Sequence, residues 1–183
     1  MKILTGRLKG RNILFKENPY LRPTSDKARK AVFDMLQGAL EGRSVLDLFS
    51  GTGALGLEAL SQGATHVTFV ESDRAQSKRI QENLARLDLA GSATVCQDDV
   101  LGWLDGGNGP FDLIFMDPPY DTDLAVKALK KIERCGVLAK GGFVVVEGRY
   151  TEDVPEECGS LKTVRRKLYG QTKMTVYATN PVS

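Results

Sequence analysis

The sequence contains few of the residues that metal sites and nucleophilic enzymes commonly use. It has one histidine, His66, and three cysteines, Cys96, Cys135 and Cys158, which lie far apart and are odd in number. This spacing fits neither a disulfide framework nor a zinc site, so we expect no metal. A Ser-His-Asp or Cys-His site would need His66, which we interpret as structural because it begins a predicted strand.

Long apolar runs are also missing. No stretch approaches the roughly 18 apolar residues that a membrane-spanning helix needs, and the first seven residues lack the apolar region of a signal peptide. We therefore expect a cytoplasmic protein with no membrane partner. We also expect it to act as a monomer. Its 183 residues, of which 42% are hydrophobic and 26% charged, suffice for one compact globular unit with an ordinary core.

Positive charge is concentrated at the N-terminus. Residues 1–30 contain nine Lys or Arg and two Asp or Glu, a net charge of +7, whereas the whole chain has a net charge of +2, so the remaining residues carry −5. A basic segment on an acidic body suggests a polyanionic partner such as nucleic acid. The alternative is a solvated surface that happens to be basic, and charge alone does not decide between the two.

The order of the predicted elements indicates an α/β fold. Residues 1–43 form a basic extension, with a short hairpin, a loop containing two prolines, and a helix that begins after Thr24 or Ser25 and continues in pattern to Leu40. Residues 44–183 form the main domain. Its strands are nearly continuous apolar runs, which is typical of a parallel sheet covered by helices on both faces. Strands are predicted at residues 44–49, 67–70, 93–96, 111–116 and 143–147, helices at 54–62, 73–88 and around 124–132, and an antiparallel hairpin at 161–168 and 172–178.

A glycine-rich loop follows the first of these strands. Gly51, Gly53 and Gly56 form a G-x-G-x-x-G pattern between a strand and a helix, where glycine lets the backbone turn tightly and approach a ligand. Glu71, which ends the second strand, can accept the two hydroxyls of an adenosine ribose. Because dinucleotide enzymes use the same pattern, the loop alone leaves an NAD-dependent oxidoreductase open.

Acidic positions near this loop favour S-adenosylmethionine over a dinucleotide. Asp47 lies four residues before Gly51, where its carboxylate can meet the ammonium group of S-adenosylmethionine but would repel a pyrophosphate. Asp99 can accept the adenine amino group or cap the following helical turn, and Asp98 competes with it for either role. The predicted cofactor contacts are Asp47, Phe49, Ser50, Gly51, Gly53, Glu71, Ser72, Asp99, Val100 and Asp117.

The fourth strand ends in the most informative tetrapeptide of the chain, Asp117-Pro118-Pro119-Tyr120. A nucleobase amino group is a weak nucleophile because its lone pair is delocalised into the ring. Asp117 and the carbonyl of Pro118 can accept its two hydrogens, and the prolines stiffen the turn that carries these acceptors. Tyr120 can stack on a flipped base. The conformational alternative is a β-turn shaped by Asp and Pro. Its position at the carboxyl end of a parallel strand, downstream of a cofactor loop, favours methylation of an exocyclic amino group.

These motifs resemble the RsmD-like family, the bacterial 16S rRNA guanine-N2 methyltransferases, over nearly the whole chain. The matching segments are residues 6–11, 22–24 with Asp26 and Arg29, 46–60, 70–71, 117–120 and 169–172. The resemblance implies a class I S-adenosylmethionine-dependent methyltransferase with a Rossmann-like, mostly parallel sheet, a C-terminal antiparallel hairpin and a short N-terminal hairpin-helix extension. Ser50 and Thr52 replace residues more usual in the family but keep their size and polarity.

The resemblance also implies a substrate. A methyl group would pass from S-adenosylmethionine to the 2-amino group of a guanine in 16S rRNA, within the small ribosomal subunit or a precursor. The nearest alternative is a DNA or other RNA adenine-N6 methyltransferase, although sequence-specific DNA enzymes usually need an added recognition domain. An NAD-dependent oxidoreductase is a second alternative, but it leaves Asp47 and the tetrapeptide unexplained. A third is an RNA-binding protein without catalysis. Substrate contacts are expected from three residues of the basic N-terminal segment, here called the basic arm: Arg7, Lys9 and Arg11. By the resemblance, they are also expected from Arg22, Thr24, Arg29 and Tyr120.

Overall fold

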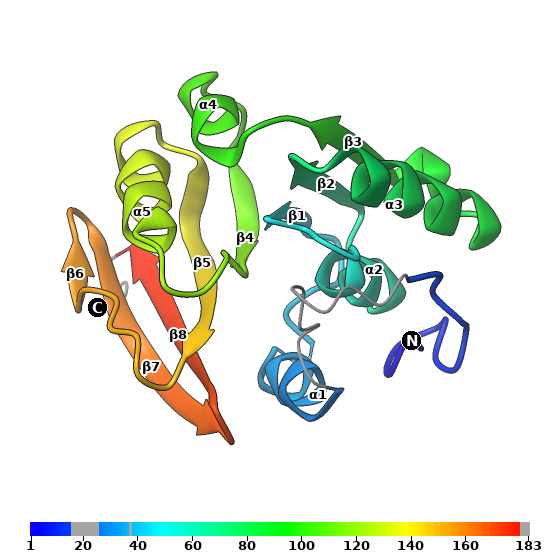
Figure 1. Cartoon of the computed structure of the whole chain (residues 1–183), viewed down its shortest axis with the longest axis horizontal. Helices are drawn as coiled ribbons and strands as arrows, with labels where there is room; N and C mark the ends of the chain where they lie inside the picture. The colour runs from blue at the N-terminus through cyan, green and yellow to red at the C-terminus, as the bar shows by residue number, and fades with distance from the viewer. Residues whose placement is uncertain (16–25, 37, 180–183) are drawn as a thin grey trace.

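The protein folds around a single eight-stranded sheet. The computed structural model describes residues 1–15, 26–36 and 38–179 (Figure 1). The strand order is β3-β2-β1-β4-β5-β8-β7-β6. The five strands from β3 to β5 in this order are parallel, and the last three add antiparallel pairs. This confirms the predicted Rossmann-like class with its C-terminal hairpin. The strands are β1 (Ser44–Leu48), β2 (His66–Glu71), β3 (Ala93–Gln97), β4 (Phe111–Met116), β5 (Leu138–Arg149), β6 (Glu157–Cys158), β7 (Leu161–Tyr169) and β8 (Thr172–Thr179).

Helices cover both faces of this sheet. One face, here called the α1 face, shares a core with α1 (Asp26–Met35), α2 (Ala54–Ser61) and α3 (Arg74–Arg86). The opposite face, the α5 face, shares a core with α4 (Val100–Asp105) and α5 (Leu124–Arg134). Alternate strand residues enter the two cores: Phe115 of β4 packs on the α1 face and its neighbour Met116 on the α5 face.

Several elements differ from their predicted bounds. The first helix ends at Met35, although Leu36 and Leu40 continue the apolar pattern and are buried in the α1-face core. The apolar spacing therefore predicts correctly that these residues are buried, but it overestimates the length of the helix. The chain turns at Gly38, whose φ is +78°. The strand predicted at residues 143–147 extends to Leu138–Arg149. The sequence predicts neither β6 nor the 3₁₀ turn at Ala90–Ser92, and it indicates α4 only as a helical turn that Asp99 can cap.

The N-terminal extension shares the core of the main domain. The predicted hairpin consists of one antiparallel bridge between Lys2 and Asn12, and Ile3 and Ile13 are buried in the same core as α2 and α3. Buried Glu58 of α2 accepts the backbone N–H of Thr5 at 3.1 Å and its hydroxyl at 2.7 Å. The extension is therefore anchored to α2. Within the described ranges, no helix combines the length and apolar character needed to cross a membrane.

Candidate active site

The predicted cofactor contacts and the predicted base-holding tetrapeptide gather at the carboxyl ends of the parallel strands. β1 lies between β2 and β4, and Leu48 of β1 is in register with Val70 of β2 and Met116 of β4. The glycine loop, Glu71 and Asp117 therefore leave the sheet from three adjacent strands at the same edge. This is the position at which open parallel sheets bind ligands.

The glycine loop is shaped by left-handed backbone conformations. Phe49, Gly51 and Gly53 have φ values of 57°, 50° and 73°. The hydroxyl of Ser50 donates to the carbonyl of Asp47 at 2.6 Å, and the N–H of Gly53 donates to the carbonyl of Ser50 at 2.7 Å. These bonds close the turn between β1 and α2, and Phe49 is the one of the three left-handed residues that carries a side chain.

Gly56 is required for a different reason. A Cβ atom at this position would lie 2.2 Å from Cε1 of Phe69, a residue of β2 buried in the α1-face core. A side chain here would force α2 away from the sheet. The third glycine of the pattern thus lets helix and strand pack closely.

Glu71 joins the ends of two elements. Its Oε2 accepts the N–H of Gly51 at 2.7 Å, and its Oε1 accepts the N–H of Asp73, the residue that caps α3, at 2.8 Å. Each carboxylate oxygen keeps a further lone pair for another donor. The sequence-predicted ribose acceptor therefore lies directly beside the glycine loop.

Asp47 is buried beneath this loop, with 1% of its surface exposed. Burial raises its pKa well above the ordinary value; a hydrogen bond from the N–H of Gly56 opposes this, and the nearby charges of Asp117 and Glu71 raise the pKa further. Three carboxyl groups thus influence one another at the end of the sheet. Such a cluster favours a cationic ligand, which would relieve their mutual repulsion.

The predicted adenine contacts lie after β3. Oδ2 of Asp99 accepts the N–H of Gly102 at 2.9 Å and so caps α4, while Oδ1 of Asp98 accepts the N–H of Asp99 at 2.8 Å. Both carboxylates are exposed, so capping leaves each able to accept another hydrogen. Ser72 is also exposed and Val100 is buried.

The tetrapeptide after β4 is held by residues that sequence reasoning missed. Glu152, three residues beyond β5, accepts the N–H of Asp121 and, at 2.7 Å, the N–H of Arg149. The guanidinium of Arg149 lies 5.0 Å from the ring centroid of Tyr120 and 3.3 Å from the carboxylate of Asp121. Asp121 has a left-handed φ of 59°. The end of β5 therefore braces the loop in a conformation that its own residues disfavour.

Tyr120 remains a neutral phenol in this setting. Burial, followed by the negative charges of Asp117, Glu147 and Glu152, raises its pKa to about 12. Glu147 is 2% exposed and follows Val146, which pairs with Met116, so it lies beside Asp117 across the β4–β5 pair. The sequence signal for Glu147 was an acidic residue at the end of an apolar strand. Pro118 is buried and Pro119 exposed, so the two prolines face different surroundings.

The basic arm lies away from this edge. Arg7, Lys9 and Arg11 are exposed. The N–H of Arg7 donates to the carbonyl of Ser61, the last residue of α2, at 2.8 Å. Since α2 has 8 residues, Ser61 lies about 12 Å along the helix axis from the glycine loop.

Arg29 is fully buried within the N-terminal half of the molecule. Its guanidinium donates to the carbonyl of Lys2 at 2.8 Å and to Asp26 at 2.9 Å, and lies 3.6 Å from Glu58. It therefore joins the extension to α2, and its substrate contact stays a prediction. Arg22 and Thr24, and the proposed cap at Thr24 or Ser25, lie outside the described residues.

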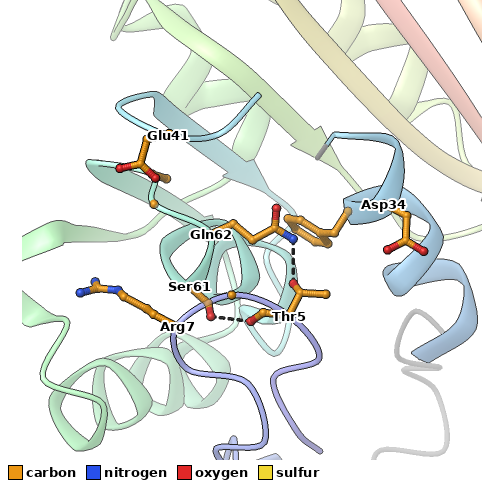
Figure 2. Close-up of a pocket in the computed structure, with 10 residues that line it drawn as sticks. Thr5, Arg7, Asp34, Glu41, Ser61 and Gln62 are labelled. Atoms are coloured by element: carbon orange, nitrogen blue, oxygen red, sulfur yellow. Dashed lines mark hydrogen bonds between the residues drawn. The ribbon is translucent and has the colours of Figure 1, made fainter. Parts of the chain in front are cut away.

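A broad surface hollow lies in this distal region. It has a volume of about 650 Å³ and lies between the N-terminal loop, the end of α1 and the C-terminal end of α2. Figure 2 shows Arg7 and Asp34 on opposite sides of it, with Thr5 bonded to Ser61 and Gln62 between them. A smaller hollow, beside Pro118, Pro119 and Glu152, adjoins the site at the strand ends. The volume of a hollow therefore does not identify the candidate active site.

His66 lies outside the site. Its Nε2 shares a hydrogen bond of 2.9 Å with the hydroxyl of Thr94 between β2 and β3. This contact between two strands is consistent with the interpretation of His66 as a structural residue.

Known proteins share this arrangement over nearly the whole chain. The family model described as Conserved hypothetical protein 95 matches residues 1–178. Ribosomal RNA small subunit methyltransferase D of Escherichia coli (strain K12) is 34% identical over 177 residues, covering 97% of this chain and 89% of that protein. The Escherichia coli protein yhhF has a TM-score of 0.88 at 30% identity, covering 99% of this chain and 98% of that chain. A hypothetical protein of Thermus thermophilus, TTHA0928, has a TM-score of 0.82 at 30% identity, with 97% and 99% covered.

The sheet order, the glycine loop beside Glu71, and these relatives define a class I S-adenosylmethionine-dependent methyltransferase. Within that class, the chain belongs to the family described as Conserved hypothetical protein 95, the RsmD family. The predicted family resemblance is confirmed.

Proposed function

We propose that this protein transfers a methyl group from S-adenosylmethionine to the 2-amino group of a guanine in 16S rRNA. The observation that carries the proposal is the adjacency of two loops: the glycine loop leaves β1, and Asp117-Pro118 leaves β4, at paired positions of neighbouring strands. A methyl donor beside the first loop would face an amino group beside the second. The substrate named for the curated Escherichia coli relative supports the choice of rRNA.

The residues present fit this cofactor. S-adenosylmethionine supplies an activated methyl group on a sulfonium, so the reaction needs no metal and no strong base. Asp47 would hold its ammonium group and Glu71 its ribose hydroxyls, and Asp99 or Asp98 its adenine amino group. The glycine loop, bare of Cβ atoms at Gly51 and Gly53, would let the ligand approach the backbone.

Asp117 and Pro118 would activate the base. The Asp117 carboxylate accepts one hydrogen of the amino group, and the Pro118 carbonyl accepts the other. Held in this way, the nitrogen loses planarity and aims its lone pair at the methyl carbon. Bound S-adenosylmethionine would supply the methyl group, and the Asp117 carboxylate would take the proton that the amino nitrogen loses on gaining it. Tyr120, a neutral phenol, would stack on the flipped guanine.

We further propose that the rRNA is recognised within the small ribosomal subunit or a precursor, in the cytoplasm, by a monomer. The described residues before β1 pack into the α1-face core as part of the main domain. A substrate already shaped by RNA folding and ribosomal proteins would need less recognition from the enzyme.

Mass-spectrometric mapping of methylated nucleosides tests the proposal. Small ribosomal subunits from cells lacking the protein are incubated with S-adenosylmethionine and either the protein or its Asp117→Ala variant. We expect one guanine to gain an N2-methyl group with the wild type and none with the variant. Methylated adenine, in RNA or DNA, would favour the adenine-N6 alternative. Calorimetry showing tight NAD binding and no S-adenosylmethionine binding would reverse the assignment altogether.

A further inference from the structure

A row of basic residues runs across one face of the C-terminal hairpin. Directly opposed residues of an antiparallel pair share a face. Arg165 is opposite Val176 and Lys167 is opposite Met174, and both apolar partners belong to the α1-face core. Tyr169 continues the same alternation at the end of β7. The side chains of these three β7 residues therefore lie on the α1 face.

Arg149 extends this row toward the active site. It is opposite Thr172 of β8, which in turn is opposite Tyr169 of β7. Arg149 also lies over the ring of Tyr120, at 5.0 Å from its centroid. We call Arg149, Arg165, Lys167 and Tyr169 together the β7 strip. It begins at the predicted base-stacking residue and runs outward along the edge of the sheet.

The strip lies at the catalytic edge of the molecule. The tip of the β7–β8 hairpin is next to the carboxyl end of β5, where the N–H of Tyr150 donates to the carbonyl of Gln171 at 2.9 Å (Figure 1). Tyr150 is 55% exposed at this tip. An RNA strand leaving the active site past Arg149 would meet this surface at once.

Arg149 is paired with Asp121, but the two outer charges of the strip are not neutralised by the described part of the protein. Arg165 and Lys167 are exposed, and neither has an ion-pair partner among residues 1–15, 26–36 and 38–179. On the opposite face of the same strand, Arg166 is paired with Glu156. Unpaired cations in a row attract a polyanion, because each phosphate contact releases condensed counterions.

We propose that the β7 strip binds the phosphate backbone of rRNA beside the target nucleotide, as a docking surface separate from the basic arm. The inference rests on the proposed rRNA substrate and identifies the surface that would bind this RNA. Arg149, Arg165 and Lys167 would contact phosphates, while the exposed ring of Tyr150 offers a face on which an unpaired base can stack.

Protection of an open sheet edge is the competing explanation. Charged side chains on an edge strand prevent other chains from pairing with it. That explanation predicts self-association when the charges are removed and no change in RNA affinity. The two explanations therefore differ in a measurable quantity.

The test compares two double variants with equal loss of charge. R165Q/K167Q removes the outer charges of the strip. K130Q/K140Q removes two exposed charges elsewhere, on α5 and near the start of β5. Affinity for naked 16S rRNA is measured by fluorescence anisotropy over a salt series. Initial rates are measured on small ribosomal subunits, S-adenosylmethionine binding by calorimetry, and self-association by analytical ultracentrifugation.

We expect R165Q/K167Q to raise the Kd for rRNA roughly tenfold near 0.1 M salt and to reduce the salt slope by about 2. KM for the subunit rises, while kcat and the affinity for S-adenosylmethionine stay at the wild-type values. K130Q/K140Q stays near the wild type in every measurement. This pattern supports the strip as an RNA surface.

Three outcomes would overturn the inference. In the first, R165Q/K167Q binds rRNA like the control variant. In the second, it only self-associates, which indicates edge protection. In the third, it loses affinity for subunits but not for naked rRNA, which indicates a ribosomal protein as the partner. If the wild type binds rRNA through the strip yet methylates no guanine, the proposed function is wrong but the RNA-binding surface is supported. If the wild type methylates a guanine and R165Q/K167Q binds rRNA with unchanged affinity, the proposed function is supported but the RNA-binding surface is wrong.

Discussion

Oδ2 of Asp47 accepts the backbone N–H of Gly56 at 2.9 Å, which ties the end of β1 to the first turn of α2 beneath the glycine loop. Asp47 is almost wholly buried, and burial raises its pKa well above the ordinary value despite this bond. Ionised Asp47 is therefore costly in the absence of a cation. The site favours a positively charged ligand at the expense of the stability of the empty protein.

Asp47→Asn should separate stability from cofactor binding. The amide oxygen still accepts the Gly56 N–H, but the buried charge is gone, so we expect Tm of the protein without cofactor to rise by a few degrees at pH 8. Loss of a charge-assisted contact worth about 1.5–3 kcal/mol should raise the Kd for S-adenosylmethionine roughly 10- to 150-fold. Scanning fluorimetry and calorimetry measure the two effects. A lower Tm with unchanged affinity would contradict the assignment.

The pH dependence supplies the control for this variant. Because the folded-state pKa of Asp47 is raised, its stabilising contribution is complete at low pH and is lost as pH rises through that pKa. Binding of a cation favours the ionised form, so wild-type affinity for S-adenosylmethionine should increase over the same range. Asp47→Asn should show a flatter pH dependence of binding.

Asp117→Ala should stop the chemistry without emptying the cofactor site. The variant loses the acceptor that pyramidalises the amino group and takes its proton, so we expect kcat to fall about 10²- to 10⁴-fold. Calorimetry should still detect S-adenosylmethionine binding. Asp123→Ala, which removes an exposed carboxylate paired with Lys127, is the matched control and should keep full activity. Full activity in Asp117→Ala would eliminate the mechanism.

Tyr120 should act through its ring and not through its hydroxyl. With a pKa of about 12, the phenol does not ionise at neutral pH, so the pH–rate profile should show no break from it below about pH 11. Tyr120→Phe should keep most of the activity. Tyr120→Ala should lose base stacking worth about 1–3 kcal/mol, a roughly 5- to 150-fold drop in kcat/KM. Equal losses in the two variants would assign the role to the hydroxyl.

Glu152 should influence catalysis from outside the reacting atoms. Its carboxylate holds the N–H groups of Asp121 and Arg149, so Glu152→Ala frees the loop that carries Asp117 and Pro118. We expect kcat to fall roughly tenfold, with a smaller change in KM for the subunit. Glu152→Gln keeps one acceptor oxygen and should recover part of kcat. A fall in Tm with kcat unchanged would indicate a purely structural role.

The basic arm should contribute affinity but not chemistry. Reversing the charges of Arg7, Lys9 and Arg11 should weaken rRNA binding and make its salt dependence shallower by about 3. The kcat on saturating subunits should be unchanged, since the arm lies at the far end of α2. Reversal at three other exposed lysines, Lys78, Lys130 and Lys140, controls for net charge. Equal effects from both triple variants would make the arm an ordinary surface.

Local patterns in the sequence predicted the conformation and the position of the two loops at the strand ends. Gly51 and Gly53 occupy left-handed positions, Gly56 packs against Phe69, and Asp117 follows a buried strand. These features depend on residues close together in the sequence and on where strands end, and both can be predicted from residue type and spacing. The hydrogen bonds from Gly51 to Glu71 and from Gly56 to Asp47 join residues that the motif already relates.

The sequence by itself determined the class of fold, the glycine loop and the acceptor tetrapeptide, because each arises from a short segment whose conformation is set by its own residues. Only the tertiary structure decided which distant groups support them. Glu152 meets Asp121 across 31 positions of sequence, and Arg149 and Lys167 share a face because β8 lies between β5 and β7. A local turn is enough to pair β7 with β8. Which strands far apart in the sequence become neighbours depends on the free energy of packing the whole core, and no pattern within one segment encodes it.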